Sequence, residues 1–146
     1  MPISHRLTRL SLALLAIAST ALAPSAFAGE ADVVKVRAKD TPSGWRFAVT
    51  VRHKDKGWDH YANNWEVLTP EGDILATRVL GHPHVNEQPF TRSLSGIEIP
   101  EGLTEVIIRA RDSVHGYGGQ MMRVDLVTRK AKVVDAASEV FAAPEA

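Results

Sequence analysis

An alternation of apolar and polar side chains runs through the chain from Val33 onward and restricts the folds available to it. It is clearest at Trp45, Phe47, Val49 and Val51, which are separated by Arg46, Ala48 and Thr50. Successive side chains of a β-strand point to opposite faces, so a period of two predicts strands with one face against a core. Spacings of three or four, which indicate an amphipathic helix, are much rarer. The pattern therefore predicts an all-β protein.

Seven short strands follow from this pattern and from the turn residues between them. Segments rich in proline, glycine and aspartate interrupt the alternation at 40–44, 70–73 and 100–102. Ser95-Gly96 shifts the alternation within one strand, as a β-bulge would. Turns at intervals of about eight to twelve residues favour a two-sheet antiparallel sandwich. The predicted strands cover residues 33–39, 45–52, 65–69, 74–80, 93–99, 104–111 and 121–127.

Trp65 lies on the third predicted strand, and this placement resembles the buried tryptophan of immunoglobulin-like domains. The resemblance implies an immunoglobulin-like or fibronectin-type sandwich, in a small exported bacterial protein. The chain has no cysteine, so the disulfide on which that tryptophan packs in antibody domains is absent. The resemblance concerns architecture from about Val33 to Val127, and it implies no function, because so common a fold hosts many.

The first 28 residues have the three parts of a secretory signal peptide. Arg6 and Arg9 precede an apolar run from Leu10 to Ala23, and Ala26-Phe27-Ala28 is a small-residue cleavage pattern. We expect cleavage near Ala28 and a periplasmic or secreted product. The expected division is a signal peptide over 1–28, a sandwich over 29–130, and a mobile or weakly helical tail over 131–146. The apolar run is short for a membrane span, and no cysteine is present for lipid attachment.

The composition and charge of the chain limit the kinds of partner that it can bind. Without cysteine the domain has neither disulfides nor thiolate ligands, so a hydrophobic core must hold it together. The whole chain has 17 basic and 17 acidic residues, and removal of the leader takes away two basic residues, Arg6 and Arg9, and no acidic one. The mature chain is therefore close to neutral. Near-neutrality without a long basic run argues against nucleic acid or an anionic membrane as the main partner. An exported protein partner remains open.

The predicted strands are connected by short turns and by long loops, and the long loops contain most of the histidines. In a sandwich of this kind successive connections fall at alternate ends. The short turns share one end, and the long loops at 54–64, 81–92 and 112–120 share the other. All five histidines outside the leader belong to these loops or, for His53, to the strand that leads into one: His53, His60, His82, His84 and His115.

We therefore expect a metal site at the long-loop end. His82 and His84 flank Pro83, so in extended backbone both imidazoles can face one side and chelate an ion. The preferred ligands are His82, His84 and His115, with His60 fourth. Neutral imidazoles with a carboxylate suit a copper or zinc ion. Met121 and Met122 follow the last loop as candidate thioether ligands, although Met122 shares the phase of the core residues.

Other residues of this end carry binding chemistry of their own. Arg92 can recognise an anion or pair with Glu87 or Asp112, while Trp58, Tyr61 and Tyr117 can stack on a ligand or anchor their loops. Two functions stay open: a soluble periplasmic metal-binding protein, and a non-enzymatic protein- or ligand-binding module without metal. A metalloenzyme is a third, weaker hypothesis, and no catalytic residue is assigned. Asp112-Ser113-Val114-His115 is too crowded for a hydrolytic triad.

Overall fold

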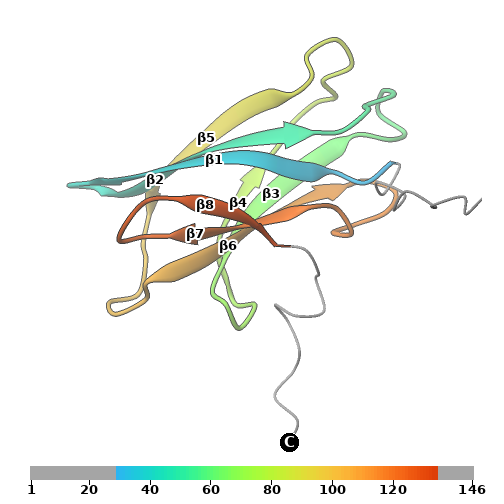
Figure 1. The fold of residues 1–146 in the computed structure, drawn as a ribbon. Coiled ribbons are helices and arrows are strands. Elements are labelled where there is room, and N and C mark those ends of the chain that lie inside the picture. The colour runs from blue at the N-terminus through green and yellow to red at the C-terminus, as the bar shows by residue number, and fades with distance from the viewer. Residues whose placement is uncertain (1–28, 135–146) are drawn as a thin grey trace, which may run out of the picture.

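Eight strands form two antiparallel sheets in the computed structural model, which describes residues 29–134 (Figure 1). The expected all-β, two-sheet sandwich is confirmed. One sheet has the order β1-β2-β5 and the other the order β4-β3-β6-β7-β8. The strands are β1 (Asp32–Thr41), β2 (Gly44–Arg52), β3 (Ala62–Leu68), β4 (Ile74–Val79), β5 (Phe90–Ile97), β6 (Glu105–Asp112), β7 (Met121–Asp125) and β8 (Ala131–Val134).

The pairing follows the immunoglobulin-like plan for most of the strands. First, second and fifth strands pair in one sheet, and third, sixth and seventh in the other, as strands A, B, E and C, F, G do in that plan. The fourth strand differs, because β4 pairs with β3 rather than joining the first sheet. The short connection at residues 69–73, closed by the Thr69 and Asp73 backbone, makes β3 and β4 a hairpin.

The core lies between the sheets and contains the alternating residues that predicted the strands. Phe47, Val49 and Val51 of β2 are fully buried against Trp65 and Val67 of β3. Met122 also lies in this core, as its phase predicted. Trp65 is completely enclosed, like the tryptophan that it resembles. Burial of these side chains supplies the main stabilisation of a chain without disulfides.

Two expectations about the strands require correction. The structure has an eighth strand, β8, which pairs with β7 from Met121↔Val134 to Val124↔Ala131. The expected boundary at residue 130 is therefore wrong by at least four residues, since 131–134 belong to the sheet. This short edge strand has two exposed positions among its four, so it lacks a strong alternation. The rest of the predicted tail, and the signal peptide, lie outside the described residues.

The long and short connections do lie at opposite ends. In Figure 1 the β1–β2 and β7–β8 turns project at the left, whereas the loops that follow β2, β4 and β6 lie at the right. The loops at the right also bond to one another: Ser113 N donates to Tyr61 O, and His84 N donates to the Asp55 carboxylate. The long-loop end is therefore one connected structure.

Candidate metal centre

A buried cluster at the long-loop end joins His53, His60 and Asp112 from different segments. One ligand atom from each residue lies within 4.8 Å of the others. The two Nε2 atoms are 3.2 Å apart, and His60 Nε2 is 3.1 Å from Asp112 Oδ1. Four ligands at Zn–N and Zn–O bond lengths on a tetrahedron stand about 3.3 Å from one another. The two observed distances are close to this value and also fall within the range of hydrogen bonds, so the spacing is compatible with a shared ion.

Asp55 fixes the tautomer of His53. Its Oδ1 lies 2.5 Å from His53 Nδ1, and both side chains are completely buried. A carboxylate can only accept there, so Nδ1 carries a proton; in a neutral imidazole Nε2 then presents a lone pair to the cluster. Asp55 also accepts from the backbone of Ala62 and His84, which holds it in place. This is the carboxylate–histidine arrangement that orients metal ligands.

The cluster has more hydrogen-bond acceptors than N–H groups that can donate to them. Gly29 O lies 3.0 Å from His53 Nε2 and 3.1 Å from His60 Nε2, and it can only accept. With neutral imidazoles, His60 supplies at most one Nε2–H for its contacts with His53, Gly29 and Asp112. The contact between His53 Nε2 and Gly29 O then sets two lone pairs face to face. A cation among these atoms resolves the conflict, either a metal ion or a proton on an imidazole.

Asp112 is held ionised at the base of the cluster. It is fully buried at the end of β6, and burial by itself raises the pKa of a carboxyl. The backbone N–H groups of His115 and Val114, with the charges of His115 and His53, outweigh this effect and lower the pKa of Asp112. Both N–H groups donate to Oδ1, at 2.7 and 2.9 Å. Its Oδ2 is buried without a hydrogen-bond partner in the described residues, so it is free to ligate.

The site opens to solvent on one side. The His53 and Asp112 side chains are 0% exposed, whereas His60 is 17% and His115 38% exposed. A hollow of about 470 Å³ lies in front of the two outer histidines and also borders Gly29, Lys54, Lys56 and Val114. Ions can therefore reach the cluster past His60 and His115 without opening the core.

The structure brings two of the four predicted metal ligands to this cluster. His60 is a member, and His115 lies beside it, with Nδ1 3.1 Å from Asp112 Oδ1 and its ring 4.9 Å from that of His60. His82 and His84 lie elsewhere on the same end. Their rings are 4.6 Å apart, and His84 stacks on Phe90 at 3.9 Å between ring centroids. Asp55 connects the two places, because its Oδ2 accepts from His84 N.

The other predicted binding residues mainly tie the loops to the sandwich. Glu87 and Arg92 form an ion pair at 3.1 Å. Trp58 and Tyr61 pack edge to face at 5.5 Å, with Trp58 67% exposed. Tyr117 donates to Glu66 and covers the guanidinium of Arg109, on the outer side of the larger sheet. Only Asp112 of this group belongs to the cluster.

Sequence reasoning did not select His53, Asp55 or Gly29 as site residues. The signal was present for the first two, because His53 and Asp55 continue the inward phase of Phe47, Val49 and Val51 beyond the end of β2. Asp112 likewise continues the inward phase of β6. Polar residues in the core phase at strand ends mark a buried polar site. Gly29 contributes a carbonyl, which no side-chain pattern reveals.

Comparisons with known proteins give a partial match. A protein from Halomicrobium mukohataei (strain ATCC 700874 / DSM 12286 / JCM 9738 / NCIMB 13541) described as "Putative lipoprotein" is 45% identical over 113 residues. The match covers 75% of this chain but 54% of that protein, so the chain spans about half the length of its relative. No family model and no solved structure matches. Within residues 29–134 no helix has the length and apolar character needed to cross a membrane.

Proposed function

We propose that this chain is an exported metal-binding protein whose site consists of the side chains of His53, His60 and Asp112 together with the backbone carbonyl of Gly29. The observation that carries the proposal is the convergence of two imidazole Nε2 atoms, the Gly29 carbonyl and the Asp112 carboxylate at metal-ligand spacing with too few protons. This ligand set replaces His82 and His84 with His53 and Asp112, and keeps His60. His115 at the rim is the candidate additional ligand.

The donor set favours zinc or divalent copper. Imidazole nitrogen suits both ions, and a carboxylate completes a site for either. Monovalent copper prefers sulfur, but Met122 is packed in the core and Met121 lies with Leu68 and Ile107 in a separate buried cluster. Bound metal would be held by His53 and His60 in the tautomers that Asp55 and the cluster impose, and it would supply a Lewis-acidic centre facing the hollow.

Export is part of the proposal. The basic, apolar and small-residue segments of residues 1–28 have the pattern of a signal peptide. The name of the Halomicrobium relative, which includes the word lipoprotein, is consistent with a product outside the cytoplasm. The mature unit would then be the sandwich that starts at Gly29 and includes β8.

A second candidate is a binding module without metal, and the exposed aromatic pair at the same end favours it. Trp58 is 67% exposed and packs edge to face with Tyr61. Large aromatic side chains exposed on loops are common anchors for protein partners. In that case a proton on one imidazole, rather than a metal, would satisfy the cluster.

Metal titration separates the two functions. The exported protein is stripped with chelator and titrated with Zn²⁺ and Cu²⁺ against a competing chelator. We expect one tightly bound ion per chain, and loss of affinity by at least about 100-fold in His60→Ala, because His60 makes three of the contacts in the cluster. His82→Ala is the matched control, since His82 is an exposed histidine of a neighbouring loop outside the cluster.

The outcomes differ clearly. Tight binding that survives His82→Ala but not His60→Ala supports the proposed ligands. Tight binding lost only in His82→Ala would contradict them and favour the pair at His82 and His84. Absence of tight binding in the unmodified protein would leave the binding module, to be tested by Trp58→Ala in partner capture.

A further inference from the structure

One face of the sandwich has a strong positive charge that the metal site does not use. Lys35, Arg37 and Lys39 occupy alternate positions of β1, so their side chains share the outer face of the smaller sheet. Arg46 of β2 lies on the same face, because it pairs directly with Lys39. All four residues are exposed.

These cations have no acidic partners in the part of the chain that the structure describes. None of the four takes part in an ion pair there; Arg46 donates instead to the Ser95 hydroxyl at 2.9 Å. The pairing of Lys39 with Arg46 sets like charges directly opposite each other, which destabilises an antiparallel sheet. The arrangement costs the fold stability, so an external anion is the natural partner for it.

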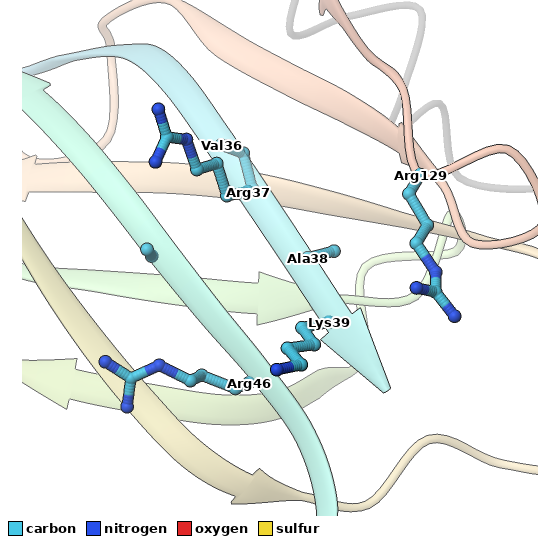
Figure 2. A pocket seen from close by; sticks show the side chains of 7 residues that line it. Val36, Arg37, Ala38, Lys39, Arg46 and Arg129 are labelled. Carbon is cyan, nitrogen blue, oxygen red and sulfur yellow. The ribbon is translucent and has the colours of Figure 1, made fainter. Parts of the chain in front are cut away.

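The cations spread over the surface instead of converging. Figure 2 shows Arg37, Lys39 and Arg46 extending from β1 and β2 to one side of β1 with their charged ends spaced apart, while Arg129 lies across β1 from Arg37. Together they line an open hollow of about 620 Å³ with Val36, Ala38 and Ala48. A compact anion would need these groups to meet at one point. Their spread suits an extended array of anionic groups.

The polar neighbours of Lys35 and Arg37 on this face carry hydroxyls; the Trp45 ring lies 6.0 Å from the Arg129 guanidinium but packs against the core. A second, smaller hollow on the face is lined by Lys35, Arg37, Ala48, Thr50 and Thr91. Single-stranded nucleic acid is usually bound by a basic groove with aromatic side chains that stack on bases, and such rings are absent from both sets of lining residues. A broad array of flexible cations and hydroxyls instead matches the headgroups of a bilayer.

We propose that the outer face of β1 and β2 binds the surface of an anionic phospholipid bilayer. Alternate residues of β1 are about 6.6 Å apart, so Lys35, Arg37 and Lys39 form a row about 13 Å long that several headgroups can contact together. The near-neutral net charge of the chain argued against an anionic membrane as a partner. Net charge does not reveal, however, that positive residues are concentrated on this face. The inference is independent of whether the cluster of histidines holds metal.

The test measures binding to vesicles made of phosphatidylglycerol and phosphatidylcholine in a 3:7 ratio, with pure phosphatidylcholine for comparison. The exported protein should sediment with the anionic vesicles at low salt, remain free with pure phosphatidylcholine, and be released as salt screens the charges. The variant Lys35→Gln/Arg37→Gln/Lys39→Gln should bind at least about tenfold more weakly, since it removes the central row.

The matched control removes three exposed lysines elsewhere, in Lys54→Gln/Lys56→Gln/Lys132→Gln. It should bind within about threefold of the unmodified protein, and any contribution from a retained leader is common to all three proteins. Equal loss in both variants would overturn the inference, because net charge and not this face would then govern binding. The inference would also be overturned if the unmodified protein did not bind anionic vesicles. Binding to single-stranded DNA in place of vesicles would count as this outcome. Unfolding temperature verifies that both variants fold.

Discussion

His84 is a buried histidine whose environment disfavours its charged form. Burial has the largest effect on its pKa and lowers it, and the positive charges of Arg92 and His82 lower it further. Glu87 and Asp55 act in the opposite direction without reversing this effect. Both ring nitrogens are buried and lack hydrogen-bond partners among the described residues, and the ring stacks on Phe90. The folded state therefore resists protonation of His84.

This residue makes stability depend on pH. The folded pKa lies below the ordinary value of 6.5, so the unfolded chain takes up the proton first as pH falls. The contribution of neutral His84 to the free energy of unfolding is complete above pH 6.5 and is lost as pH falls from there through the lowered pKa of the folded state. The total loss is about 1.4 kcal/mol for each pH unit that separates the folded and unfolded pKa values. In urea unfolding between pH 7.5 and 5, His84→Phe should lose less stability than the unmodified protein. A His82→Gln control should retain more of the slope than His84→Phe, because it removes only one of the smaller effects that lower the pKa of His84. Identical slopes in all three proteins would contradict the assignment.

At the scale of the elements, the β1–β2 hairpin depends on a close approach to β5. Gly44 begins β2 with a φ of +112°, and a Cβ there would lie 3.1 Å from Gly96 C and Ile97 O. These atoms belong to the β5 bulge, where pairing shifts from Phe47↔Leu94 to Trp45↔Ile97. The bulge that the Ser95-Gly96 pattern predicted therefore brings backbone against the hairpin turn, and only glycine fits between them.

Substitution of Gly44 by alanine should expose this constraint. We expect Gly44→Ala to destabilise the protein by about 2–3 kcal/mol, because the positive φ and the backbone contact act together. Gly102→Ala is the control: its φ is +85°, but a Cβ there meets nothing within 4 Å, so it should cost only about 1 kcal/mol. Chemical denaturation gives both values, and equal costs would show that the close approach has no effect.

At the scale of the whole molecule, the proposed metal joins distant parts of the chain. Gly29 precedes β1, His53 and His60 follow β2, and Asp112 ends β6, so the ligands come from both sheets. An ion held by these groups binds the folded state and not the unfolded chain. Binding then adds directly to the stability of the entire sandwich.

Metal should accordingly raise the unfolding temperature. At free metal about 1,000-fold above Kd the gain is about 4 kcal/mol, which corresponds to more than 10 °C for a domain of this size. Calorimetry with Zn²⁺ and with chelator measures it. His60→Ala should abolish the difference, whereas His82→Ala should retain it. The same unfolding temperature with metal and with chelator would count against the site.

The alternation in the sequence was sufficient for much of this structure. The buried Trp65 was implied by the resemblance to immunoglobulin-like domains. The alternation and the turn residues predicted the seven strands found between Asp32 and Asp125, the bulge in β5 and the gathering of long loops at one end. These features follow from local periodicity and from a simple rule of connection. The alternation missed β8, a half-exposed edge strand whose partner β7 compensates for its weak pattern.

The sequence by itself determined that histidines would collect at the long-loop end, and the tertiary structure decided which of them meet. His82 and His84 are two residues apart and their rings lie close together, yet they are separate from the cluster, and His84 stacks on Phe90. His53 and Asp112 come together because each lies two residues after a buried residue, Val51 of β2 and Ala110 of β6, and so points into the space between the sheets. That contact depends on sheet packing and register. Spacing along one chain segment records neither, so only the folded molecule could place the two imidazoles, the carboxylate and the Gly29 carbonyl around one point.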